Sequence, residues 1–349
     1  MRGPWFSCLS CVVLAFAVLA GCGDREQPLE LRGPAMGTTY SVIVTRLPQG
    51  THEADVRAAI ETVLVGADRH LSGWNAASEV ARFNAEPTTD WQPVSPELLD
   101  VLAEARAVHD ASGGAFDVTV APLVQAWGFG AHAGGQPRVP SAEERQQLLE
   151  RTGFARLELR SEPPGLRKSV PDLEIDLDGI APGWAVDRIA ERLEALGIRD
   201  YLVELGGEVR ATGLSPGSRP WRVAVEAPLS GERRPQAVIE VESAGVSTSG
   251  DYREFLDLDG RRVSHTIDPR TGAPVTHGLA AVTVVARSTA AADAWATALM
   301  VLGPEQGLPL ATRLGMAVLF VERGAQPGTF VESQTPQFEQ LRLPDRARL

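Results

Sequence analysis

Apolar residues recur at helical spacing in the first quarter of the chain. Val56, Ile60, Val63 and Ala67 stand three to four positions apart within residues 53–71. Residues at that spacing share one face of an α-helix, so this stretch predicts an amphipathic helix with one buried side.

Two further helices are predicted from their ends. Ser95 followed by Pro96 is a typical helix start, and Gly113 is a typical stop, so a helix is expected over about 95–112. Ser141 and Glu144 have the spacing of a capping box and predict a third helix.

Two more helices are predicted in the second half of the chain. Ala185, Ile189 and Leu193 lie on one face of a helix that Gly197 ends. The other helix covers about Thr289 to 302 and is rich in alanine.

Strands dominate between these helices. Alternating or β-branched runs predict strands at 36–45, 173–177, 201–205, 221–226, 237–242, 262–267, 281–286 and 316–321. Gly/Pro-rich loops are expected at 128–140 and 161–171. The elements show no regular βαβ rhythm, which favours an α+β fold with largely antiparallel sheets packed by helices. No Rossmann or P-loop glycine pattern occurs, so a phosphate-bearing ligand would need another cradle.

The N-terminus has the pattern of an exported protein. An apolar run from Leu9 to Ala20 follows the charged Arg2, and L-A-G-C at 19–22 resembles a bacterial lipobox. The alternative, a transmembrane anchor, is disfavoured because the run is shorter than the roughly 20 residues of a spanning helix. We therefore expect residues 1–21 to be a lipoprotein signal peptide and Cys22 to carry lipid. The protein would then be membrane-anchored and face the periplasm or cell exterior.

Composition bounds what the mature chain can be. Residues 22–34 are polar and predict a tether, residues 35–322 predict one functional domain, and residues 323–349 predict a polar tail of low order. The net charge of −12 argues against nucleic-acid binding, which needs a basic face. Cys8 and Cys11 lie in the signal, so the mature domain has neither a disulfide nor a thiolate metal site.

Asp293 and Thr297 are the first candidates for chemistry. They stand four residues apart on the alanine-rich helix and so project from one face. A helix with so little surface charge is buried, and a buried carboxylate needs a cation or hydrogen-bond donors. A carboxylate plus a hydroxyl suits Mg²⁺, which keeps water and substrate phosphates as its other ligands. The alternative is a buried Asp bonded to local backbone or to an Arg.

The second candidate is the junction I-D-L-D-G-I-A-P-G-W-A-V-D at 175–187. Gly179 and Gly183 let a ligand approach the backbone, and a helix start attracts anions. Asp176 and Asp178 oppose a bare phosphate unless a cation is present. A plain strand–turn–helix junction would give the same pattern.

Aromatic, histidine and hydroxyl residues complete the candidates. Phe116, Trp127 and Phe129 could pack against a flat ring or could belong to the core. His265 could accept a proton from an attacking hydroxyl, although a lone strand histidine is usually structural. The turn at 246–252 could bond a ligand or be only a turn.

In their order along the chain, these segments resemble the ApbE family of FAD:protein FMN transferases. The matching blocks are M-G-T-T-Y-S (36–41), L-S-G-W-N-A-A-S-E-V-A-R-F-N (71–84), G-G-A-F-D-V-T-V-A-P-L (113–123), W-G-F-G (127–130), D-L-D-G-I-A-P-G-W-A-V-D (176–187), L-G-G-E-V (205–209), S-T-S-G-D-Y (247–252), H-T-I-D-P-R-T-G-A-P-V (265–275) and A-D-A-W-A-T-A-L-M-V-L-G (292–303). They cover nearly the whole mature chain.

The resemblance implies a T-fold-like architecture with a flavin site in the cleft between sheets and helices. It implies Mg²⁺-dependent transfer of FMN from FAD to a Thr or Ser hydroxyl of a target flavoprotein, with AMP released. The positions matching the metal ligands are Gly179, Asp293 and Thr297, and His265 matches a histidine proposed to act near the hydroxyl. The positions matching the FAD lining are Met36, Trp74, Ala115, Phe116, Asp117, Asp176, Pro182 and Ile267.

Two positions depart from the family pattern. Trp74 stands where Tyr is frequent, which keeps a stacking face but changes the hydrogen bonding. Pro182 stands where Lys or Glu is frequent and offers no charge. Two alternatives stay open, an FAD pyrophosphatase that gives FMN and AMP and a non-catalytic flavin-binding lipoprotein. For a transferase, the implied clients are flavoprotein subunits of membrane redox complexes of the Nqr and Rnf type.

Overall fold

The computed structural model describes residues 27–130, 138–229, 231, 234–251, 255–258, 261–326 and 328–344. The predicted signal peptide 1–21 and Cys22 lie outside these residues, as does part of the predicted loop at 128–140.

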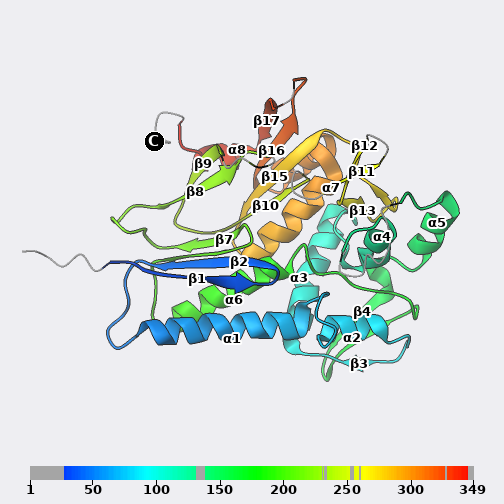
Figure 1. Ribbon diagram of the computed structural model, residues 1–349, viewed down its shortest axis with the longest axis horizontal. Helices are drawn as coiled ribbons and strands as arrows, with labels where there is room; N and C mark the ends of the chain where they lie inside the picture. The colour runs from blue at the N-terminus through cyan, green and yellow to red at the C-terminus, as the bar shows by residue number, and fades with distance from the viewer. Residues whose placement is uncertain are drawn as a thin grey trace, which may run out of the picture.

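An eight-stranded sheet forms the centre of the fold (Figure 1). The order of its strands is β1 (Leu29–Ala35), β2 (Thr38–Val44), β6 (Tyr201–Leu205), β7 (Glu208–Thr212), β10 (Ser243–Gly250), β15 (Leu279–Ala286), β16 (Ala317–Arg323) and β17 (Phe330–Gln334). Every neighbouring pair is antiparallel. With the helices below, this confirms the predicted α+β class.

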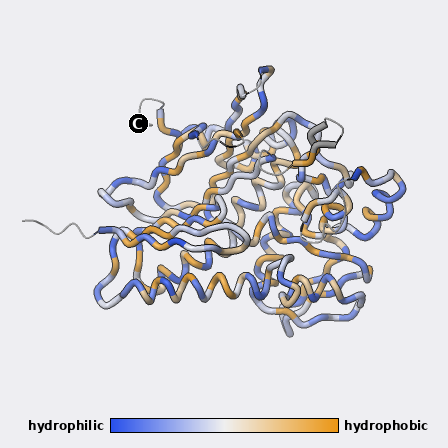
Figure 2. Tube along the Cα trace, in the orientation of Figure 1, coloured by the Kyte–Doolittle hydropathy of each residue, from blue (hydrophilic) through white to orange (hydrophobic). Residues whose placement is uncertain are grey.

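Long helices cover one face of this sheet. They are α1 (Glu53–Leu71), α3 (Pro96–Ser112), α6 (Ala181–Ala195) and α7 (Thr289–Arg313), and α6 lies between α1 and the sheet in Figure 1. The predicted ends of α3 are confirmed, because the Ser95 hydroxyl accepts the Leu98 N–H and Gly113 closes the helix with φ 66°. Orange segments recur along α1 in Figure 2, and the buried residues of this helix stand three to four positions apart, as expected for a one-sided helix.

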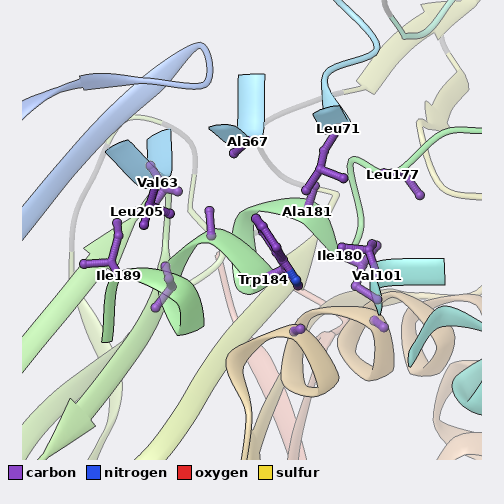
Figure 3. Packing of buried hydrophobic residues seen from close by; sticks show 14 of the residues in the cluster. Val63, Ala67, Leu71, Val101, Leu177, Ile180, Ala181, Trp184, Ile189 and Leu205 are labelled. Carbon is purple, nitrogen blue, oxygen red and sulfur yellow. The ribbon is translucent and has the colours of Figure 1, made fainter. Parts of the chain in front are cut away.

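The main core lies between these helices and the sheet. Figure 3 shows Ile180, Ala181 and Trp184 of the α6 start close to Leu71 of α1 and Val101 of α3. All five belong to one buried cluster, which fixes where α6 begins relative to α1 and α3.

The opposite face of the sheet carries a second core. A hairpin of β8 (Trp221–Glu226) and β9 (Pro235–Val241) packs there together with α8 (Pro336–Leu341). The predicted low-order tail is therefore wrong for much of its length, because β17 pairs with β16 and Phe338 of α8 is fully buried. The polar composition of this segment concealed two fully buried residues, Thr335 and Phe338.

Smaller elements surround the helical side. They are α2 (Glu79–Ala85), β3 (Gln92–Pro93), α4 (Ala121–Ala126), α5 (Ala142–Glu150), β4 (Leu157–Ser161), β5 (Pro164–Lys168), β11 (Phe255–Leu258), β12 (Arg261–Ser264), β13 (Ile267–Asp268) and β14 (Ala273–Pro274), with short 3₁₀ turns at Val118–Val120 and Phe154–Arg156. The capping serine predicted for α5 is confirmed, since Ser141 accepts the Glu144 N–H.

Several predicted boundaries are wrong. The tether prediction fails over 29–34, which belong to β1 and pair with β2. The predicted loop at 161–171 contains β5, which pairs with β3 and β4. The strand predicted at 262–267 is divided between β12 and β13. The alanine-rich helix continues to Arg313, because a kink at Gly303, with φ 68°, lets a second helical segment follow.

Candidate functional site

Asp293 and Thr297 lie one turn apart on α7, at the inner side of the helix. Asp293 is only 5% exposed, and its Oδ2 accepts the backbone N–H of Gly183 at 3.1 Å. The Thr297 hydroxyl lies 3.3 Å from the Ser249 hydroxyl on β10. The predicted burial of this carboxylate is confirmed.

Gly179 meets Thr297 from the other side of the site. A Cβ placed on Gly179 would lie 3.0 Å from Thr297 Oγ1 and 3.3 Å from Cε2 of Phe116. The turn before α6, the middle of α7 and the Phe116 loop therefore converge at one point. The structure thus brings Gly179 and Thr297 together, with Asp293 one turn away on the same helix.

The surroundings of Asp293 are negative. Burial is the main cause that raises the pKa of Asp293 well above its ordinary value, and the Glu208 carboxylate is the next. Asp178 and Asp187 act in the same direction. A buried carboxylate among other carboxylates is stabilised by a cation, so the donor set fits Mg²⁺. Within the described ranges no group of three or more His, Cys, Asp or Glu side chains is arranged to hold a metal, so hydroxyl, backbone and substrate oxygens would have to complete the shell.

Residues 173–177 belong to no strand or sheet, so the strand predicted there is wrong. The Asn84 side chain makes the two hydrogen bonds to Ile175 that a neighbouring strand would make. Its amide N–H donates to the Ile175 carbonyl at 2.8 Å, and its amide oxygen accepts the Ile175 N–H at 2.8 Å. The Asp176 carboxylate in turn accepts the Asp178 N–H at 2.8 Å. These bonds fix the approach to Gly179.

A pocket opens along this segment. Its lining residues are Gly73, Asn84, Ala121, Val124, Gln125, Gly130, Ile175, Asp176 and Asp178. Trp74, which is 65% exposed, follows Gly73, and its indole N–H donates to Asp178 at 3.3 Å. The indole faces therefore remain available beside the pocket for stacking against a flat ring.

Asp176 gives the pocket a titratable group near neutrality. Burial, followed by the nearby Asp178 charge, raises the pKa of Asp176 to about 7. The charged form therefore destabilises the fold, and this cost appears as pH rises from about 4 through about 7. At 1.36 kcal/mol per pH unit, the raised pKa lowers the free energy of unfolding by about 4 kcal/mol. Because the Asp176 side chain is only half-buried, water screens its charge and reduces this effect to about 2 kcal/mol.

We expect Asp176→Asn to stabilise the ligand-free protein above pH 7 and to leave it unchanged near pH 4. Urea unfolding at several pH values measures this difference. Asp90→Asn, on an exposed loop, is the matched control. An Asp176→Asn stability curve parallel to that of the unmodified protein across this pH range would refute the prediction.

The remaining predicted flavin-lining residues have different surroundings. Met36 occupies the β1–β2 turn in a left-handed conformation, φ 47°, which costs energy for a residue other than glycine. Pro182 is half-buried in the first turn of α6. Ala115 and Phe116 are buried, in two different apolar clusters. Ile267 is buried in a third cluster, where it packs with Trp127.

Asp117 serves the local fold. Its carboxylate accepts the Thr119 N–H, the Thr119 hydroxyl and the Phe154 N–H at 2.8, 2.6 and 2.9 Å. These three bonds, together with its burial, hold the Asp117 carboxylate within the local fold.

His265 lies between β12 and β13 and is half-buried. Its ring stands edge-on to Phe129, with centroids 6.2 Å apart. The structure therefore brings the histidine to Phe129 of the W-G-F-G segment, and the next residue of that segment, Gly130, lines the pocket.

Comparison with known proteins decides the family. The model of the ApbE family matches residues 36–320. The chain belongs to the ApbE family. The FAD:protein FMN transferase of Escherichia coli (strain K12) is 35% identical, with 96% of this chain and 97% of that protein covered. That of Klebsiella pneumoniae (strain 342) is 38% identical, with 93% and 94% covered.

Solved ApbE structures have the same fold. The apo flavinyl transferase ApbE of Pseudomonas stutzeri superposes with a TM-score of 0.82 at 43% identity, covering 90% of this chain and 96% of that chain. The flavin transferase ApbE of Vibrio cholerae gives 0.81 at 37% identity, covering 90% and 99%. This ApbE-family chain is therefore an enzyme, a transferase that acts on flavin.

Some residues of the site were not singled out from the sequence. Asn84 and Asp187 support the turn and the helix that carry the predicted ligands. The turn predicted at 246–252 is wrong over 246–250, which belong to strand β10, although its Ser249 hydroxyl lies beside Thr297. No local sequence pattern could have predicted the roles of Asn84 and Asp187, because their hydrogen-bond partners lie about a hundred residues away along the chain.

Proposed function

We propose that the chain transfers FMN from FAD to a Thr or Ser hydroxyl of a client protein, releases AMP and requires Mg²⁺. One observation supports this most: the turn that leaves the pocket at Asp178 continues into Gly179, where an added Cβ would lie 3.0 Å from the Thr297 hydroxyl oxygen. Two adjacent residues, Asp178 and Gly179, thus connect the pocket proposed for the flavin with the oxygen ligands proposed for the cation. The family assignment supports the flavin part independently.

In the proposed reaction the acceptor oxygen bonds to the phosphorus of the FMN half. The bond from that phosphorus to the bridging oxygen breaks, and AMP leaves with the electron pair. A cation held by Asp293, Thr297 and Gly179 would supply positive charge to the diphosphate. The other requirement is orientation, to which the stacking face of Trp74 and the Asn84-bonded turn contribute.

His265 is proposed to take the proton of the attacking hydroxyl. Its place beside Phe129 and the pocket segment supports this role. If water replaced the acceptor hydroxyl, the same groups would hydrolyse FAD to FMN and AMP. A flavin carrier would retain FAD without turnover.

The test is incubation of the protein with FAD and Mg²⁺, with and without a client flavoprotein domain. Transfer predicts covalent FMN on the client by mass spectrometry and AMP release that depends on the client. His265→Ala should slow transfer about 10²-fold while FAD affinity changes little. Rapid AMP release without any client would favour the hydrolase, and FAD retention without turnover would favour the carrier.

We further propose that the protein is lipid-anchored through Cys22, faces the periplasm or cell exterior and modifies subunits of Nqr- or Rnf-type complexes. The lipobox-like L-A-G-C supports the anchor. Among the helices of the described part of the chain, none combines the length and apolar character needed to cross a membrane. A Cys22→Ser variant that stays in the membrane fraction would contradict the lipid anchor.

A further inference from the structure

Two carboxylates join α6 and α7 by each capping the other helix. Asp187 of α6 accepts the backbone N–H groups of Thr289 and Ala290, both at 2.9 Å. These are the first two residues of α7. In return Asp293 of α7 accepts the N–H of Gly183, the third residue of α6. Each carboxylate thus satisfies donors that a helix start leaves without intrahelical partners.

The backbones at this junction are in close contact. A Cβ on Gly183 would lie 2.5 Å from the Thr289 carbonyl oxygen. A Cβ on Gly245 of β10 would lie 2.5 Å from the Thr289 backbone nitrogen. The start of α7 is therefore enclosed between α6 and β10, and Asp187 fixes its position along the α6 surface.

Other contacts at the same point are weaker or indirect. Ser288 accepts the Ala291 N–H at 3.1 Å and donates to Glu104 at 2.9 Å. The Arg210 guanidinium lies 4.0 Å from Asp187 and balances part of its charge. Asp187 alone among these side chains accepts two N–H groups of the helix, and its negative charge also suits a helix N-terminus.

We propose that Asp187 is a positioning residue for the cation site: by fixing the start of α7 it sets Asp293 and Thr297 against Gly179. This inference rests on the cation role in the proposed function. Asp293 lies one turn beyond the capped residues, so a shift of the helix start moves it directly. Ligand sets require placement within about 0.5 Å, which makes affinity sensitive to such a shift.

The experiment is a Mn²⁺ titration of the FAD-loaded protein, with free Mn²⁺ followed by electron paramagnetic resonance. Asp187→Asn keeps the side-chain size but loses the charge and one acceptor. We expect it to raise the Mn²⁺ dissociation constant about tenfold, as seen when groups that orient metal ligands are removed. Ser95→Ala is the matched control, because it removes the cap of α3, which carries none of the proposed ligands. It should lower the melting temperature without changing Mn²⁺ affinity.

A folded Asp187→Asn protein with unchanged Mn²⁺ affinity would overturn the inference, as would an equal loss of affinity in Ser95→Ala. If Asp187→Asn does not fold, Asp187→Glu tests the same contact, because it keeps the charge but moves the carboxylate by one methylene. It should weaken Mn²⁺ binding a few-fold, and a folded Asp187→Glu protein with unchanged binding would overturn the inference. An unmodified protein that binds no Mn²⁺ would remove the proposed cation role as well, whereas normal binding with unaffected variants removes only the role of Asp187.

Discussion

Asp293→Asn should reduce flavin transfer about 10²- to 10³-fold, the range produced by losing one preorganised electrostatic contact in an active site. The amide has nearly the same shape and still accepts the Gly183 N–H, but it carries no charge for a cation. Transfer is measured as covalent FMN on the client at saturating FAD. Thr312→Val is the control, because that exposed hydroxyl, later on α7, donates within the helix to the Leu308 carbonyl.

The same substitution should leave the fold as stable as before or more stable. Burial and Glu208 raise the pKa of Asp293 above its ordinary value, so the ionised form opposes folding as pH rises through that pKa. Removing the charge removes this cost at neutral pH. Thermal unfolding without Mg²⁺ measures it. Loss of transfer together with a lower melting temperature would point to a structural role, and retained Mg²⁺-dependent transfer would remove Asp293 from the cation site.

Helices with local signals could be predicted from the sequence. Helix α1 has its apolar spacing, and α3 has its Ser-Pro start and glycine end, within the residues of the helix itself or next to them. The predicted bounds of both helices therefore agree with the structure. The buried Asp293 followed from the alanines around it. These inferences needed no knowledge of distant contacts.

The sequence did not predict elements whose stabilising partners lie far away along the chain. Pro164–Lys168 reads as a turn, yet it is the central strand of a three-stranded sheet, and its fully buried Lys168 donates to the carbonyls of Phe83 and Leu173. Residues 173–177 have a strand pattern, yet no strand pairs with them: Ile175 bonds to the Asn84 side chain, and the Asp176 N–H donates to the Val118 carbonyl. Sequence pattern shows which residues favour extension but not which group will pair with them.

The residues of the candidate site also differ in whether they could be predicted from the sequence. Gly179, Asp293 and Thr297 could be placed on a turn and a helix face, and the family resemblance supplied the link between them. The capping of α7 by Asp187 depends on how two helices separated by about a hundred residues meet. Only the structure shows that contact.

Gly183→Ala should destabilise the protein by about 3 kcal/mol, although alanine has a higher helix propensity than glycine. In an open helix the change would be favourable by about 1 kcal/mol. Here the added Cβ would lie 2.5 Å from the Thr289 oxygen and 2.9 Å from the Ala290 Cα, and such backbone atoms move only together with α7. Overpacking of this kind costs roughly 1–3 kcal/mol, and occasionally more where the backbone must shift.

Urea unfolding measures this difference, and Gly66→Ala is the matched control. Gly66 also lies inside a helix, α1, but a Cβ there meets nothing within 4 Å. Gly66→Ala should therefore stabilise the protein by up to about 1 kcal/mol. If both substitutions stabilised it, α6 and α7 would have to be free to separate. The reciprocal carboxylate caps would then not be what holds Asp293 in place.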